Sequence, residues 1–96
     1  MIKHILLFKF KQGVSEEEKN IGIEMLKALK NKVPEIGEWE IGIQREKSEK
    51  FYDFAQVSSF ESIEDMKNFR ENPEHEKVRV YLKERADWVK VDYDFP

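Results

Sequence analysis

Residues 2–10 read IKHILLFKF, and this stretch decides which fold the chain can adopt. Its even positions are apolar apart from His4, whereas its odd positions are apolar only in the middle, at Ile5 and Leu7. Alternation with a period of two predicts a β-strand whose successive side chains point to opposite faces of a sheet. Because both faces of this strand carry apolar side chains, we expect both faces of its sheet to be covered.

A helix is expected to follow this strand. Ser15 precedes Glu18 by three residues, a spacing typical of a capping box at a helix N-terminus. Apolar residues then recur at helical spacing as far as Val33, and Pro34 cannot continue a helix. The pattern predicts a helix from about residue 16 to residue 32.

The rest of the chain continues this alternation of element types. Strands are predicted at residues 39–44 and 52–60, joined by a charged loop. Ser62 and Asn72 are suited to cap two helical segments, and Pro73 is suited to the first position of the second. A last strand is predicted at residues 88–95.

The predicted order is βαββαβ, which is that of a ferredoxin-like α+β fold. In this fold a four-stranded antiparallel sheet carries its helices on one face. Ile5 and Leu7 would then point to the face without helices, where an uncovered apolar patch would be larger than monomers usually expose. We therefore expect two copies to pair their sheets as a homodimer, which closes a dimeric α/β barrel.

Length, charge and cysteine content exclude several classes of protein. A chain of 96 residues has room for a single domain, spanning residues 1–96. With 17 basic and 20 acidic side chains it carries a net charge of -3, so we expect no nucleic-acid partner. It has no apolar run of about 18 residues and no signal-peptide pattern, so we expect no membrane partner and a cytoplasmic location. The absence of cysteine excludes disulfides, a thiolate nucleophile and a Cys-type zinc site.

Several segments, in order along nearly the whole chain, resemble the stress-responsive α/β-barrel domain family, often called Dabb. The resemblance begins with the first strand and its early histidine, His4. It continues through LKALK at 26–30, VPEI at 33–36, DFA at 53–55, NPEH at 72–75 and WVKVDY at 88–93. The resemblance implies the ferredoxin-like fold and the dimeric barrel that the periodicity also predicts.

The family includes a plant polyketide cyclase that closes an aromatic ring without a cofactor. Two histidines of the cyclase pocket match His4 and His75, and the tyrosine that serves as its acid matches Phe69. The resemblance implies a pocket with His75 as the catalytic base and His4 as the orienting group, and with a ligand-binding wall made of Leu6, Phe8, Leu26, Gln56 and Phe69. Because Phe69 has no titratable proton, the cyclase mechanism cannot be transferred intact.

Three classes of function remain open. The chain could bind or transform a small apolar or aromatic molecule, act as a non-catalytic stress or assembly homodimer, or be a cofactor-free monooxygenase or polyketide-cyclase-like enzyme. The histidines could instead be structural, His4 bonding to the backbone and His75 holding the helix break at Pro73. A metal site would give His75 oxygen ligands from Glu74, Glu76 or Asp53; no ligand spacing recurs, and we expect neither a metal nor a cofactor.

Overall fold

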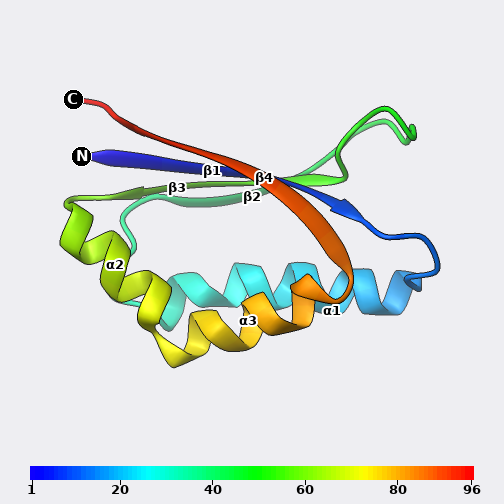
Figure 1. Ribbon diagram of the computed structural model, residues 1–96, viewed down its shortest axis with the longest axis horizontal. Helices are drawn as coiled ribbons and strands as arrows, with labels where there is room; N and C mark the ends of the chain where they lie inside the picture. Colours follow the sequence, from blue (N-terminus) through cyan, green and yellow to red (C-terminus); the bar gives the residue numbers. More distant parts are fainter.

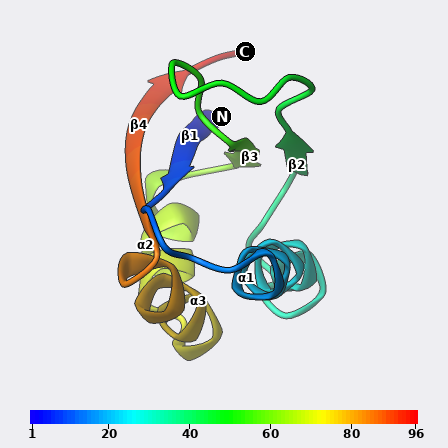
Figure 2. The same cartoon turned by 90° about the vertical axis from the view of Figure 1, so that its right-hand side faces the viewer.

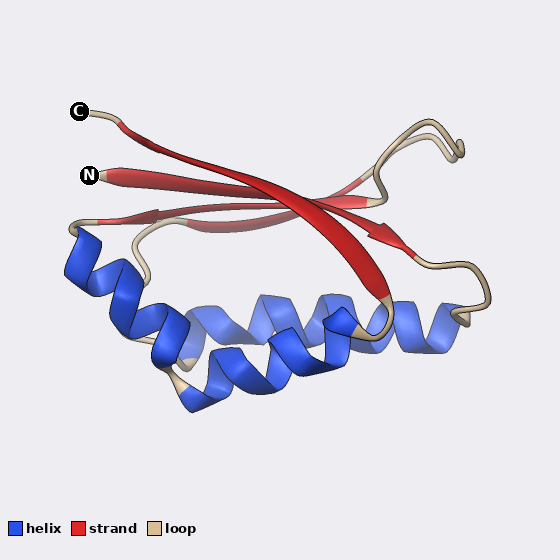
Figure 3. Ribbon diagram, in the orientation of Figure 1, coloured by secondary structure: helices blue, strands red, loops and turns tan.

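All helices of the chain lie on one face of a four-stranded antiparallel sheet (Figures 1 and 3). The computed structural model describes residues 1–96. In chain order the elements are β1 (Ile2–Phe10), α1 (Glu16–Ala28), the 3-10 turn η1 (Leu29–Asn31), β2 (Trp39–Ile43), β3 (Phe54–Phe60), α2 (Ile63–Glu71), α3 (Pro73–Lys83) and β4 (Ala86–Asp94). The predicted βαββαβ order is confirmed, and the two helical segments predicted after Ser62 and Asn72 are α2 and α3.

The first strand occupies an interior position, because the strand order is β2-β3-β1-β4. On one side of β1, Leu6 lies opposite Gln56 of β3, and on the other side it lies opposite Lys90 of β4. Directly opposite residues of antiparallel strands point to the same face of the sheet. Gln56 and Lys90 therefore share the helix-facing side with the even-numbered residues of β1.

The helices begin at the predicted capping residues. The Ser15 hydroxyl accepts a hydrogen bond from the Glu18 backbone N–H, and the Glu18 side chain bonds back to the Ser15 N–H, which completes the capping box. Ser62 caps α2, and Asn72 caps α3 with Pro73 in its first turn. No helix combines the length and the apolar character that crossing a membrane requires.

Several predicted boundaries were wrong by a few residues. α1 ends at Ala28, and the chain continues as the tighter turn η1, where the Leu29 carbonyl accepts from the N–H groups of residues 32 and 33. Pro34 disfavours the helical conformation of the residue before it, which accounts for this tightened exit. β3 begins at Phe54 instead of residue 52, and β4 runs from Ala86 to Asp94.

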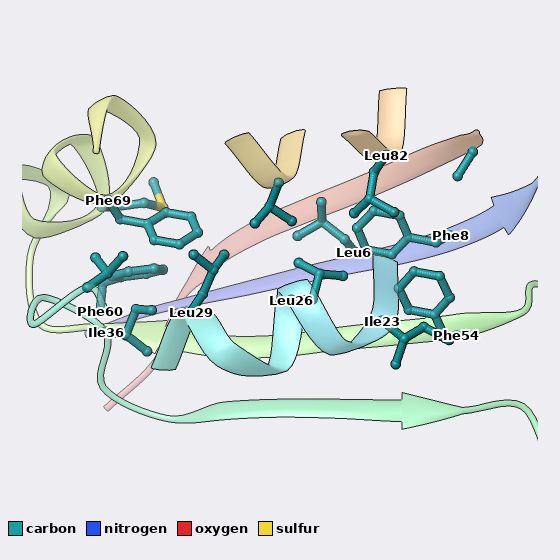
Figure 4. Packing of buried hydrophobic residues seen from close by; sticks show 14 of the residues in the cluster. Leu6, Phe8, Ile23, Leu26, Leu29, Ile36, Phe54, Phe60, Phe69 and Leu82 are labelled. Atoms are coloured by element: carbon teal, nitrogen blue, oxygen red, sulfur yellow. The ribbon is translucent and has the colours of Figure 1, made fainter. Parts of the chain in front are cut away.

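The core fills the space between the sheet and the helices (Figure 4). Two pairs of aromatic rings mark its ends. Phe8 and Phe54, on neighbouring strands, stack with ring centroids 4.5 Å apart, and Phe60 meets Phe69 of α2 at 5.0 Å. Leu26 of α1 lies between the two aromatic pairs in Figure 4. Burial of these side chains is the main force that holds the helices on the sheet.

The opposite face of the sheet carries no helix (Figure 2). Its middle is made of two apolar rows across the three strands β3, β1 and β4. In one row Ile5 lies between Val57 and Val91, and in the other Leu7 lies between Ala55 and Val89. Leu7, Val89 and Val91 are 37%, 51% and 52% exposed, so this apolar surface is uncovered within one chain.

Gly37 lies at a close approach between the segment that enters β2 and the end of β3. Its N–H donates to the Ser59 carbonyl at 2.8 Å, and a Cβ at this position would lie 3.0 Å from that carbonyl oxygen and 2.8 Å from Ser59 Oγ. Gly42, within β2, has open space where a Cβ would lie. The two glycines therefore make a matched pair for testing this contact.

We expect Gly37→Ala to lower the free energy of unfolding by about 1–3 kcal/mol, because the added methyl group overpacks against backbone. Gly42→Ala should cause no loss, since alanine restricts the unfolded chain more than glycine does. Urea denaturation followed by circular dichroism measures both values. Equal stability of the two variants would show that the contact at Ser59 imposes no constraint.

Candidate functional site

A cavity of about 300 Å³ lies between the helix-facing side of the sheet and the helices. All seven residues proposed from the sequence line it. They come from five elements: His4, Leu6 and Phe8 from β1, Leu26 from α1, Gln56 from β3, Phe69 from α2 and His75 from α3. The fold thus brings the two histidines of the chain to one cavity, although 71 positions of sequence, 75 minus 4, separate them.

Seven more residues line the cavity, and the predicted ligand-binding site did not include them: Arg70, Glu76, Val78, Arg79, Leu82, Trp88 and Lys90. Helical spacing could have found three of these. Val78, Arg79 and Leu82 follow His75 by three, four and seven residues, which places them on one face of α3. Strand alternation could have found Trp88 and Lys90, because they alternate with the outward-facing valines of β4.

His4 is held by a carboxylate on the neighbouring strand. Asp92 of β4 lies directly opposite His4 of β1, and its Oδ1 bonds to the imidazole Nδ1. Because an ionised carboxylate can only accept, Nδ1 carries the proton and Nε2 is left as a proton acceptor. This partner differs from the backbone group that the structural hypothesis expected for His4.

Burial lowers the pKa of His4 below its ordinary value of 6.5, and the hydrogen bond and charge of Asp92 oppose this effect without overcoming it. The imidazole is only 6% exposed, so desolvation of its cation outweighs one bonded carboxylate. Burial raises the pKa of the Asp92 carboxyl. The bond to His4 and the charge of Lys90 lower this pKa by more, so that it lies below its ordinary value. Near neutral pH the pair is therefore a neutral imidazole and an ionised carboxylate.

His75 lies in the first turn of α3, and its Nδ1 is 3.2 Å from the Arg70 carbonyl oxygen at the end of α2. A carbonyl can only accept, so Nδ1 donates and Nε2 is again the acceptor nitrogen. The bond spans the break between the two helices, as the structural hypothesis proposed for His75. Burial lowers the pKa of His75 below its ordinary value of 6.5, and the bond to the Arg70 carbonyl opposes this effect.

Phe69 contacts both imidazoles. Its ring centroid lies 4.3 Å from that of His75 and 6.2 Å from that of His4, and its side chain is buried. Phenylalanine carries no hydroxyl on its ring. The cavity therefore holds two proton acceptors and no tyrosine acid at this position.

Gln56 supplies the amide group of the cavity. It is 3% exposed, it lies on β3 opposite Leu6, and its side chain lines the cavity. No side-chain nitrogen or oxygen that is fully enclosed in the chain lacks a hydrogen-bond partner. Because Gln56 lines the cavity, its amide can both donate a hydrogen bond to a small molecule there and accept one from it.

The carboxylates considered for a metal site with His75 do not converge on it. Asp53 accepts a hydrogen bond from the Phe10 N–H at 2.7 Å, near the far end of β1. Glu76 accepts two bonds from Arg79, and Glu74 pairs with Lys77 at 3.6 Å. The structure contains no group of three or more His, Asp or Glu side chains placed to hold a metal ion.

The sequence matches the family described as the stress responsive A/B barrel domain over residues 2–95. The chain belongs to this family. The family prediction drawn from the order and spacing of the segments is therefore confirmed. An uncharacterized protein of Streptomyces coelicolor is 32% identical over 97 residues, a match that covers 99% of this chain and 100% of the relative.

Solved structures share the fold of this stress responsive A/B barrel domain. A dimeric protein of unknown function and ferredoxin-like fold from Bacteroides fragilis is 32% identical, with a TM-score of 0.82 over 98% of this chain and 95% of that chain. A hydroxynitrile lyase from Passiflora edulis superposes with a TM-score of 0.84 over 99% of this chain and 96% of that chain. At 23% identity, that second likeness concerns the fold alone.

We expect an NMR titration of the imidazole C–H signals to give both histidines pKa values below 6.5. The chain has only two histidines, so their signals are simple to assign. Asp92→Asn should lower the pKa of His4 further, because it removes the carboxylate that favours the imidazolium. Stability should fall as the pH drops below 6.5, since the unfolded chain then binds protons that the folded chain does not. A raised pKa for His4 in Asp92→Asn would contradict the assigned roles of burial and bond.

Proposed function

We propose that the protein is a homodimer in which each protomer binds one small apolar or aromatic molecule in the cavity and accepts a proton from it. The observation that carries this proposal is that both histidines of the chain line one largely apolar cavity. Its volume of about 300 Å³ lies at the small end of the range, about 300–1,000 Å³, that is typical of ligand sites.

The chemistry we propose uses the two free imidazole nitrogens. His75 acts as the general base, since burial keeps its ring neutral and its Nδ1–H is already engaged by the Arg70 carbonyl. His4, held by Asp92, orients the ligand at the depth of the cavity, where Gln56 offers a further hydrogen bond. Because Phe69 offers no proton, we propose proton acceptance without the tyrosine acid of the cyclase-like relatives.

The homodimer would form through the outer face of the sheet. Two apolar rows centred on Ile5 and Leu7 cross this face, and pairing two such faces would cover them. The structural relative from Bacteroides fragilis is described as dimeric. The cavity lies on the opposite side of the sheet, so dimer formation would leave it open to ligand.

Sedimentation analysis at micromolar concentration should give twice the chain mass of 11.6 kDa. Leu7→Asp should convert the protein to monomer or unfold it, because it places a charge in the buried centre of the interface. Val80→Asp is the matched control, since Val80 is 48% exposed on α3, on the helix side of the molecule. A wild-type monomer, or a dimer that survives Leu7→Asp, would overturn the barrel arrangement.

Proton acceptance can be tested with 4-nitrophenol and its methyl ether, 4-nitroanisole, which lacks the acidic hydrogen. At a pH where the phenol is protonated, we expect it to bind about tenfold tighter than the ether, because one hydrogen bond to a buried group has roughly this effect. Trp88 lines the cavity, so quenching of tryptophan fluorescence reports binding. Absorbance of the phenolate reports transfer of the proton.

His75→Ala should bring the affinities of the two ligands together. Lys77→Ala, on the same helix but outside the cavity, should retain the preference of the wild-type protein. If neither compound binds, the small-molecule proposal fails and a non-catalytic assembly role becomes the better account. If both bind equally well to the wild-type protein, the imidazoles are not the recognising groups.

A further inference from the structure

Three cationic side chains lie around the mouth of the cavity, and the proposed proton transfer uses none of them. Arg70 comes from the end of α2, Arg79 from α3 and Lys90 from β4, and all three line the cavity. Their side chains are 45%, 38% and 50% exposed, whereas His4 and Gln56 are buried. The cavity therefore opens to solvent between α2, α3 and β4.

Only one of these cations has a partner of its own. Arg79 donates to both carboxylate oxygens of Glu76, from Nη2 at 2.6 Å and from Nε at 2.9 Å, and this bidentate pair has no net charge. Arg70 and Lys90 instead share a single oxygen, Asp92 Oδ2, each at 3.4 Å. The mouth thus contains a neutral ion pair, Arg79 with Glu76, and a group of three charges, Arg70 and Lys90 with Asp92, in which the positive charge is in excess.

The group of three charges carries a net positive charge. The other oxygen of Asp92, Oδ1, is bonded to His4, whose imidazole is neutral. One carboxylate therefore faces two cations, Arg70 and Lys90, which leaves one positive charge at the mouth of a chain whose net charge is -3. The hydrogen bonds of the Arg70 guanidinium use Nη2 alone, so its other N–H donors remain available for an incoming anion.

We propose that Arg70 and Lys90 bind the carboxylate of a ligand whose apolar body fills the cavity, so that the ligand is an apolar or aromatic monocarboxylic acid. This inference rests on the proposed function, because it names the chemical class that the same cavity accepts. A carboxylate matches the planar fork of an arginine and carries one negative charge. A phosphate monoester carries about −1.5 to −2 charges at pH 7, which a single excess positive charge does not balance.

Calorimetry on the full chain with three ligands tests this assignment. The ligands share a phenylalkyl body and differ in their polar end: 3-phenylpropanoate, 3-phenylpropanamide and 2-phenylethyl phosphate. We expect the carboxylate to bind at least about tenfold tighter than the amide, since bonds to charged groups exceed those to neutral ones. Its affinity should fall as salt is added, whereas that of the amide should not.

Arg70→Gln should reduce the affinity for the carboxylate to that for the amide, and Lys90→Gln should reduce it in part. Retained affinity for the amide shows that each variant is folded and that its cavity is intact. Lys67→Gln is the matched control, because Lys67 is exposed on α2 one turn before Arg70 and does not line the cavity. It makes the same change of charge and should leave all three affinities unaltered.

The outcomes separate this inference from the proposal on which it rests. Equal binding of carboxylate and amide overturns the anion site and leaves small-molecule binding intact. Tighter binding of the phosphate overturns the carboxylate class. If 4-nitrophenol binds but none of these three ligands does, the inference alone fails; if nothing binds, the proposed function fails and the inference falls with it.

Discussion

The position of β1 between β3 and β4 is the constraint on which the rest of the structure depends. A strand paired on both edges cannot slip by one residue without moving every side chain to the other face. Its even residues therefore form the sheet side of the core and cavity, and its odd residues form the uncovered outer face. The inward direction of His4 and the outward direction of Leu7 follow from this single arrangement.

The contact between His4 and Asp92 connects the depth of the cavity to its mouth. One carboxylate oxygen fixes the tautomer of a buried imidazole, and the other meets Arg70 and Lys90 near the solvent. Burial has a larger effect on the pKa of His4 than the carboxylate has, so the imidazole stays neutral. The negative charge of Asp92 is therefore balanced only by Arg70 and Lys90. The state of the imidazole and the charge at the mouth are thereby coupled.

The fold alone does not decide what such a cavity does. A hydroxynitrile lyase shares this architecture, as does a dimeric protein of unknown function. In the present chain the cavity wall includes Phe69 beside both imidazoles and the amide of Gln56. Chemistry therefore has to be argued from these side chains.

Sequence patterns that span only a few residues were enough to predict the type and order of the strands and helices. The alternation in β1, the capping box at Ser15 and the helix break after Asn72 each express a local backbone preference, and family resemblance supplied seven of the 14 residues that line the cavity. The predicted ends of helices and strands were less accurate, because alternative backbone hydrogen bonds, such as those to the Leu29 carbonyl after α1, decide where an element stops. Only the tertiary structure joined His4 to Asp92, 88 positions away, and placed Arg70 at the mouth. Such pairings depend on strand register and helix packing, which no local pattern encodes.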